Sequence, residues 1–311
     1  RQLLNLPMDP FSGYSSRKVN AGNIQNEGVE ISLNGLILDN PKGLSWNSTA
    51  QFSLNRNKII DLYPGVTLYD IKTLDAIQIV AVQGSYYGDI YGQTFQRVED
   101  KNDPNYGKII VGEDGLPLIT TGKSKVGNQS PDWMLGWTNS FSYKGFNLSF
   151  LGDFRIGGDL YSATASNLYT RGNAAGTVVN GERQDFIVPN SVVQTPNGYT
   201  ENKVPVTHQN YWERIGSTGN YGLPEMYTYD ATNIRLRNIT LGYDFNKAML
   251  KNTPFQRLRL SATCNNVWMI HYNLPGIDPE SVSATNTNAT GFENGAAPTS
   301  RSFTFNVTVG F

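Results

Sequence analysis

Five segments of the chain alternate apolar side chains with polar or small ones, and this pattern restricts the fold more than any other feature. In 302–311 the odd positions hold three Phe and two Val, whereas the even positions hold Ser, Thr, Asn and Gly. Successive side chains of a β-strand point to opposite faces of its sheet. Each segment therefore predicts a strand with one apolar face. The five segments are 44–54, 133–143, 146–155, 257–264 and 302–311.

Four further segments predict strands less clearly and bring the expected number to nine. In 232–243 the apolar positions are even up to Leu236 and odd from Ile239 onward. A β-bulge inserts one extra residue into a strand and produces such a slip. We therefore expect a bulge near Arg237 and Asn238. The other three segments are 28–38, about 76–83 and about 88–97.

The polar faces of these strands distinguish a membrane barrel from a soluble β-sandwich. They carry Ser, Thr, Asn and Gln with little Lys or Glu, and charged residues make up 16% of the chain, against about 25% in ordinary soluble proteins. Aromatic residues lie near strand ends, as in the girdles of membrane barrels. We therefore expect an all-β fold, a transmembrane antiparallel β-barrel. The alternative is a soluble sandwich in which the apolar face packs on a core.

Composition excludes several other classes of protein. No stretch approaches the roughly 18 apolar residues that a membrane-spanning helix needs. The net charge of −1 argues against a nucleic-acid partner held by a basic face. Cys264 is the single cysteine, which rules out a disulfide framework. The sequence from Arg1 onward shows no basic region leading into an apolar one, as a signal peptide would.

Short and long connections alternate between the expected strands. The short ones lie at 39–42, 84–88 and 143–146. Bacterial barrels have short periplasmic turns and long extracellular loops, so we expect the turns and the C-terminus on the periplasmic side. Residues 1–27 are then a remnant of an extracellular loop, and 28–311 form the membrane part. The long extracellular loops are expected at about 55–75, 98–132, 157–231 and 268–300.

Nine strands do not close a bacterial barrel, because single-chain barrels of this class have an even number. An open sheet would leave two unpaired edges, which are a liability for any sheet. We therefore expect the chain to be the C-terminal part of a larger barrel. The remaining strands would come from polypeptide on the N-terminal side of this sequence.

Several motifs in order along the chain resemble the SusC/RagA family of TonB-linked outer-membrane proteins of Bacteroidetes. The resemblance covers almost the whole chain. It rests on Asn20–Glu30, Trp46, Asn55–Ile59, Val126–Pro131, Tyr143–Phe146, Gly157–Asp159, Asn233–Tyr243, Asn265–Val267, Pro275–Glu280, Pro298–Phe303 and the final Phe311.

The resemblance implies a 22-stranded barrel, of which this chain would supply the last nine strands. It also implies an N-terminal plug that contacts TonB, a SusD-like surface lipoprotein as a lid, and a place in the cell outer membrane. The implied function is active import of an oligosaccharide or a peptide. The alternative is a barrel of this family that serves as a scaffold subunit of an outer-membrane assembly or secretion complex.

Catalytic and cofactor motifs find no support in the sequence. His208 and His271 are the only histidines and have no Cys or His at the spacing of a zinc site. Residues 100–105 resemble a calcium-binding loop, but Pro104 and the lack of a closing Glu argue against calcium binding there. We expect no enzyme, no metal site and no cofactor.

Two sets of residues are candidates for function. Charged residues at the polar positions of the alternating strands are expected to face the lumen and to pair with the plug or with one another. Aromatic and basic residues of the long third loop are candidates for contact with substrate or a partner, although they could equally pack that loop. The first set is Glu30, Asp153, Arg155, Arg257 and Arg259, and the second is Tyr161, Tyr169, Arg171, Tyr199, Tyr211, Trp212 and Tyr221.

Overall fold

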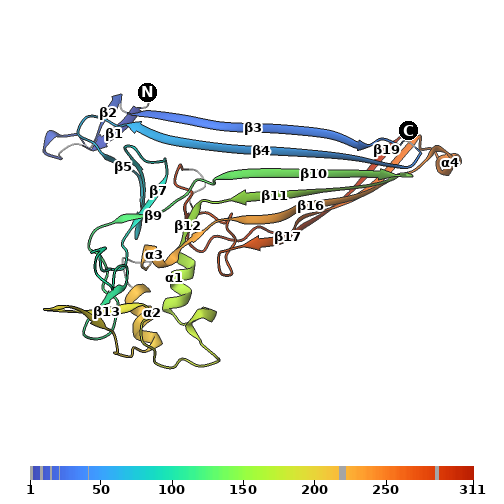
Figure 1. Ribbon diagram of the computed structural model, residues 1–311. Coiled ribbons are helices and arrows are strands. Elements are labelled where there is room, and N and C mark those ends of the chain that lie inside the picture. The colour runs from blue at the N-terminus through green and yellow to red at the C-terminus, as the bar shows by residue number, and fades with distance from the viewer. Residues whose placement is uncertain are drawn as a thin grey trace.

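The largest sheet of the computed structural model has seven antiparallel strands, and it is much longer than it is wide (Figure 1). The structure describes residues 3–7, 10–14, 16–20, 22–40, 42–216, 222–283 and 287–311. Across the sheet, the strands follow the order β19, β17, β16, β11, β10, β4 and β3. Their bounds are β3 Asn23–Leu38, β4 Leu44–Asp61, β10 Trp133–Tyr143, β11 Phe146–Ile156, β16 Asn233–Asp244, β17 Arg257–Tyr272 and β19 Ser302–Gly310.

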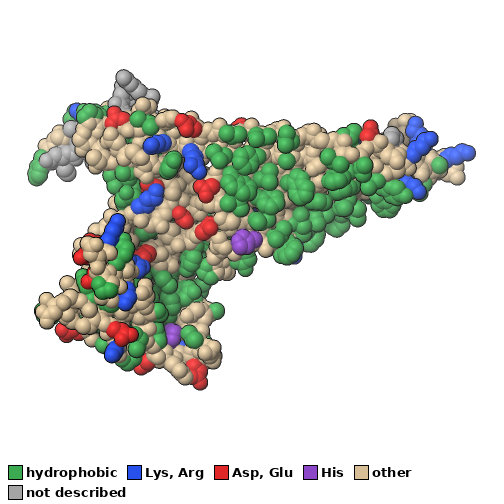
Figure 2. Space-filling model, in the orientation of Figure 1, with side chains coloured by type: hydrophobic (Ala, Val, Ile, Leu, Met, Phe, Trp, Pro, Cys, Tyr) green, Lys and Arg blue, Asp and Glu red, His purple; other side chains and the backbone are tan. Residues whose placement is uncertain are grey.

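The register of the sheet gives it one apolar face and one polar face. Leu148 pairs with Phe141 on one side and with Leu241 on the other, so apolar side chains line up across strands. On the polar face, the hydroxyl groups of Thr240 and Thr263 lie 2.8 Å apart. The side chain of Phe305 is 80% exposed, and Figure 2 shows apolar side chains covering this part of the molecule. The alternation in the sequence therefore predicts the two faces correctly.

The bulge expected near Arg237 and Asn238 is confirmed. Leu236 of β16 pairs with Trp268, and the next paired residue is Asn238, which faces Asn265. On the other side of β16 the register shifts at the same place. Arg237 is thus the inserted residue, which explains why the apolar parity changes from even to odd.

The prediction of nine strands in one sheet is wrong, because two of them lie elsewhere. β6 (Ile77–Val82) and β7 (Asp89–Gly92) belong to a separate sheet with the order β5, β6, β7, β9. Residues on both faces of β6 are buried, including the consecutive Ile79 and Val80. A short strand that is buried on both faces lacks the alternation of a strand between lipid and water. The turn at 84–88 accordingly lies in this small sheet and not among the turns of the large one.

Three connections of the large sheet fold together at one of its ends, and we call them the loop body: residues 62–132, 157–232 and 273–301 (Figure 1). The opposite end, the turn end, carries the short turns and α4 (Lys247–Leu250). No helix among the described residues is long and apolar enough to cross a membrane. The remaining elements are β1 Leu3–Pro7, η1 Pro10–Ser12, β2 Ser16–Asn20, β5 Leu68–Leu74, β8 Ile109–Val111, β9 Ser124–Asn128, β12 Asp159–Ser162, α1 Ala163–Thr170, η2 Ala175–Thr177, β13 Ser191–Thr195, β14 Gly198–Glu201, α2 His208–Gly216, α3 Pro224–Tyr227, β15 Thr228–Asp230 and β18 Phe292–Glu293.

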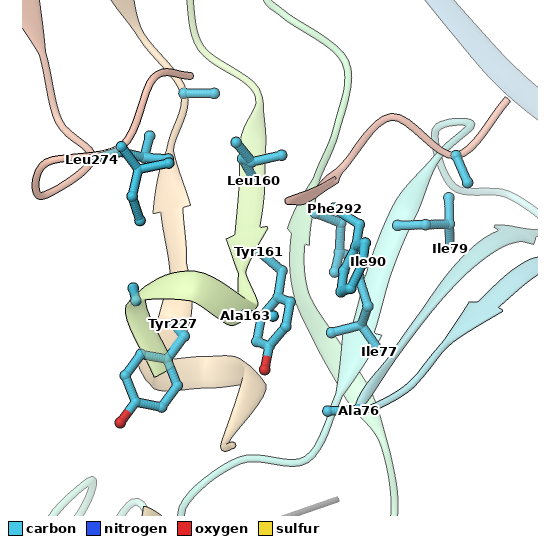
Figure 3. Packing of buried hydrophobic residues seen from close by; sticks show 14 residues of the cluster. Ala76, Ile77, Ile79, Ile90, Leu160, Tyr161, Ala163, Tyr227, Leu274 and Phe292 are labelled. Carbon is cyan, nitrogen blue, oxygen red and sulfur yellow. The ribbon is translucent and has the colours of Figure 1, made fainter. Parts of the chain in front are cut away.

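The loop body has an apolar core to which all three connections contribute. Ile90 comes from the first connection, Tyr161 from the second, and Leu274 and Phe292 from the third (Figure 3). The rings of Tyr161 and Phe292 stack with their centroids 5.9 Å apart. Burial of such side chains contributes about 1.5–3 kcal/mol each. The loops are therefore packed against one another and form one body.

The large sheet does not close into a barrel within the described residues. β3 and β19 each pair with a neighbouring strand on one side only. The structure thus confirms the expected antiparallel sheet and shows it as an open one.

Phe150 lies on the apolar face beside Phe141, with ring centroids 6.2 Å apart. In the full-length protein, Phe150→Arg is expected to reduce the free energy of unfolding by about 2–4 kcal/mol, because it places a guanidinium in hydrocarbon. Ser149→Arg is the matched control, since Ser149 occupies the polar face opposite Ser140. Urea unfolding in lipid vesicles measures both. Equal losses in the two variants would contradict the assignment of the faces.

Candidate functional site

A polar cavity of about 420 Å³ lies where the polar face of the sheet meets the loop body. β4 extends beyond the predicted strand and carries Asn55 and Asn57 into the lining. Asn128 and Asp159 line it from the loop body. The side-chain oxygen of Asn57 is buried and has no hydrogen-bond partner within the described residues. The cavity therefore offers amide and carboxylate groups to a polar solute.

The wall opposite β4 depends on a pair of glycines. Gly157 and Gly158 have φ angles of +76° and +79°. A Cβ on Gly157 would lie 2.4 Å from the carboxylate of Asp132, and one on Gly158 would lie 3.1 Å from the backbone of Gln129. Glycine alone among the residue types adopts such angles at little cost. The pair lets the chain leave β11 and turn sharply into β12.

Asn128 joins the first connection to the second at the cavity. Its side-chain amide donates to the backbone oxygen of Tyr87 at 3.1 Å and to the carboxylate of Asp89 at 2.8 Å. Its backbone N–H donates to the carboxylate of Asp159 at 2.8 Å. These bonds fix the positions of the polar groups before any solute binds.

The charge of the lining is predominantly negative. Burial raises the pKa of Asp159; the N–H of Asn128 acts against this rise, and the carboxylates of Asp230 and Asp132 add to it. Arg56 lies with its guanidinium carbon 6.0 Å from the ring centroid of Tyr86 at the rim. The site can form hydrogen bonds and stack an aromatic ring on a solute. No cluster of at least three His, Cys, Asp or Glu side chains suited to a metal occurs in the described residues.

A buried arginine–carboxylate cluster ties the third connection to the polar face. Arg235 is 4% exposed and forms hydrogen bonds with both carboxylate oxygens of Asp278. Arg237 bridges two carboxylates, Asp153 of β11 and Glu280, and donates to Glu280 at 2.8 Å. Two arginines from the strand thus hold a loop segment that lies more than 40 residues away in the sequence.

The pKa values of the two loop carboxylates reflect this pairing. Burial by itself would raise the pKa of Asp278, but hydrogen bonds from Arg235 and Thr299 outweigh it and keep the pKa below its usual range. Burial by itself would also raise the pKa of Glu280. The hydrogen bond from Arg237 and the charge of Arg235 outweigh this effect and lower the pKa. Both groups are therefore ionised at neutral pH.

The five charges expected on the lumen side do not gather in one place. Asp153 joins the arginine–carboxylate cluster, and Arg155 donates to the backbone oxygen of Gln129 at 3.2 Å. Arg259 lies 3.9 Å from Asp244 at the turn end. Glu30 is exposed in the middle of β3, and Arg257 is exposed at the start of β17. Their roles in the whole protein stay a prediction.

The aromatic residues of the second connection are mostly packed inside the loop body. Tyr161 is fully buried, and Tyr211 and Trp212 are 9% and 8% exposed. Tyr169 packs on Trp212 with ring centroids 4.4 Å apart. The packing alternative therefore describes the environment of these four side chains in the structure.

Three members of that set have other positions. Arg171 is exposed just after α1, and Tyr199 is half-buried beside the small cluster of Val98, Ile110 and Val192. Tyr221 lies outside the described residues.

Of the arginine–carboxylate cluster, only Asp153 is among the residues expected from the sequence. Arg235 and Arg237 are two positions apart on a strand, and Asp278 and Glu280 are two apart in a loop. Two arginines and two carboxylates with the same spacing are only a weak indication that the four side chains form ion pairs. The motifs that carry them, 233–243 and 275–280, already appear in the family resemblance.

Comparison with known proteins relates this chain to TonB-dependent receptors. It is 26% identical over 330 residues to TonB-dependent receptor P3 of Formosa agariphila, with 98% of this chain and 30% of the relative covered. It is 24% identical over 280 residues to TonB-dependent receptor SusC of Bacteroides thetaiotaomicron, with 86% and 25% covered. The chain is a distant homologue of TonB-dependent receptors of the SusC/RagA type.

The homologous segment spans 30% and 25% of the length of these two relatives. Its fold matches a solved structure of the RagAB peptide transporter with a TM-score of 0.67 at 18% identity, over 99% of this chain and 31% of that one. No family model matches. TonB-dependent receptors are transporters and not enzymes, which agrees with the expected lack of catalysis.

The depressed pKa of Asp278 makes the attachment of the third connection dependent on pH. A carboxyl group with a lowered pKa stabilises the folded state above its unfolded value of about 3.8, and this stability is lost as the pH falls towards the folded value. In the full-length protein, cleavage of 273–301 by an acid-active protease is expected to rise steeply below about pH 4.

Asp278→Asn should weaken this pH dependence and leave the part that Glu280 contributes. It should also destabilise the attachment by up to about 3–5 kcal/mol at neutral pH, because the buried Arg235 keeps only Glu280, at 3.4 Å, as a charge partner. Asp114→Asn serves as the control, because Asp114 pairs with Arg214 at an exposed position. If Asp278→Asn showed the same acid sensitivity as the parent protein, the cluster would not be the attachment.

Proposed function

We propose that the chain is the C-terminal part of the barrel of an outer-membrane TonB-dependent transporter that actively imports an oligosaccharide or a peptide. One observation carries the proposal: 98% of the chain aligns with a TonB-dependent receptor. The amphipathic sheet supports it, because an apolar outer face and a polar inner face suit a barrel between lipid and a water-filled lumen.

The shape of the chain supports one orientation in the membrane. The short turns and the end of β19 lie at one end of the sheet, and the loop body lies at the other (Figure 1). Outer-membrane barrels have short turns on the periplasmic side and long loops outside. We therefore place the turn end in the periplasm and the loop body outside the cell.

Energy is needed because a wide barrel that simply stayed open would leak. A plug that fills the lumen prevents this leak, and TonB would act on it to let the substrate pass. The plug and the remaining strands of the proposed 22-stranded barrel would come from polypeptide outside this sequence. The relatives are about three to four times as long as the matched segment, which leaves room for these parts.

The polar cavity at Asn57 is the proposed contact with substrate on this chain. Its lining supplies side-chain amide, aromatic and carboxylate groups. Hydroxyl groups of a sugar or N–H groups of a peptide could form hydrogen bonds with these groups. Arg171 and Tyr199 are further candidates, because their side chains are not fully buried.

A SusD-like lipoprotein is the proposed lid over the loop body. The matched solved structures are described as a peptide importer in closed and open states. The packed core of the loop body would give such a lid a firm surface. The second candidate function, a scaffold subunit of a secretion or assembly complex, would use the same surface for several protein partners.

Uptake by cells that carry the full-length protein tests the proposal. Removal of TonB is expected to abolish uptake of labelled oligosaccharides or peptides, and affinity purification is expected to recover one lipoprotein. Uptake that persists without TonB would contradict active import. Recovery of many partners together with no uptake would favour the scaffold.

Asn57→Ala examines the cavity itself. Loss of one hydrogen bond to the substrate, worth about 1 kcal/mol, is expected to raise the KM for uptake about fivefold. Asn102→Ala should leave the KM unchanged, because Asn102 lies exposed in a turn of the first connection and is not among the residues that line the cavity. A KM that Asn57→Ala does not alter would remove this cavity from the substrate path.

A further inference from the structure

The turn end of the sheet is strongly basic. Lys42 lies in the β3–β4 turn, Lys144 in the β10–β11 turn, Lys247 and Lys251 on and after α4, and Arg257 at the start of β17. All five side chains are exposed. Figure 2 shows this basic group at the far end of the sheet from the loop body.

A row of aromatic and aliphatic residues lies directly next to this basic group. Register places Tyr143 beside both Leu44 and Phe146, and Phe146 beside Tyr243, so the row crosses the sheet near its turn end. The ring centroids of Phe146 and Tyr243 are 4.6 Å apart. Such aromatic rows mark the boundary between hydrocarbon and headgroups in membrane barrels. The lysines therefore lie at the depth of the headgroups.

Negative charge at the turn end is small by comparison. Asp244 accepts a hydrogen bond from Asn147 at 2.8 Å and lies 3.9 Å from Arg259. Asp39 is the one other carboxylate in the described part of the turns between the sheet strands. Asp39 is thus the one carboxylate left to balance the charge of four lysines and Arg257, and most of that positive charge has no counterpart within the described part of these turns.

α4 sets two of the lysines in a fixed position. The side chain of Asn246 caps the helix by accepting from the N–H of Met249 at 3.0 Å, and Leu250 is buried beneath it. Lys247 and Lys251 are four residues apart and so share one side of the helical turn. Met249 is 56% exposed beside them. Apolar and basic side chains therefore project together from this turn.

We propose that the basic turn end binds the headgroups of anionic phospholipids in the adjoining leaflet. This inference requires the apolar face to lie in lipid, as the proposed function has it, but it does not depend on transport. Lysine side chains lay their apolar stems along hydrocarbon and place the ammonium among headgroups. A lysine near an anionic membrane surface gains about 1 kcal/mol, which is roughly fivefold in affinity. The continuous apolar face beside the lysines selects a lipid over a free phosphate.

Native mass spectrometry of the full-length protein, purified in detergent with equal amounts of phosphatidylglycerol and phosphatidylcholine, tests this site. The parent protein is expected to retain phosphatidylglycerol at least about fivefold more than phosphatidylcholine. The variant K42Q/K144Q/K247Q/K251Q is expected to lose this preference. The control K72Q/K101Q/K123Q/K203Q removes four exposed lysines of the loop body and should keep it.

Heat-modifiable mobility in electrophoresis confirms that both variants are folded. The proposal is overturned if the parent protein retains both lipids equally, if the turn-end variant keeps the preference, or if the loop-body control loses it to the same extent. An acidic protein that co-purifies with the parent but not with the turn-end variant, without any lipid preference, would assign the surface to a protein instead.

Discussion

Hydrocarbon contains no water, so every backbone N–H and C=O of a strand in lipid must be paired within the protein. The five inner strands of the large sheet satisfy this condition by pairing on both sides. β3 and β19 satisfy it on one side only. Each unpaired group in lipid costs several kcal/mol, which over a whole strand rivals the stability of a domain. Under the proposed function, strands supplied by polypeptide outside this sequence cover these edges and complete the barrel.

The loop body follows different rules, because an apolar core to which all three connections contribute holds it together. Its three connections also share polar contacts. Gln129 donates to the backbone oxygen of Asn288 at 2.7 Å and accepts from the N–H of Gly291 at 3.0 Å. The buried carboxylate of Glu293 accepts from Ser162 and Thr164 at 2.6 Å each. The arginine–carboxylate cluster then attaches this body to the polar face of the sheet.

The sequence predicts the strands of the large sheet well, because a strand between lipid and water must alternate. The segment 133–143 coincides with β10 at both ends, and the phase change in 232–243 locates the bulge at Arg237. The same pattern fails for β6, since a strand buried on both faces shows an apolar run that local periodicity cannot place in a particular sheet.

Contacts between distant segments could not be predicted from local pattern. Arg235 forms a hydrogen bond with Asp278, which lies 43 residues later in the sequence. The spacing within either motif does not predict that the two residues pair. Tyr161 and Trp212 illustrate the same limit, because aromatic side chains suit a binding surface as well as an apolar core. Only the fold shows that both point into the loop body. The two faces could thus be predicted, whereas the cavity at Asn57 depends on the way the first and second connections meet the end of β4.

The shared contacts of the loop body have a mechanical consequence. Glu293 joins the third connection to α1 of the second, and Gln129 joins the third to the first. No connection can swing away without breaking bonds to the other two, so the individual loops cannot act as independent flaps. Any widening of the mouth would then be a tilt of the whole body about the points where the chain leaves the strands, and the two glycines after β11 lie at one of these pivots.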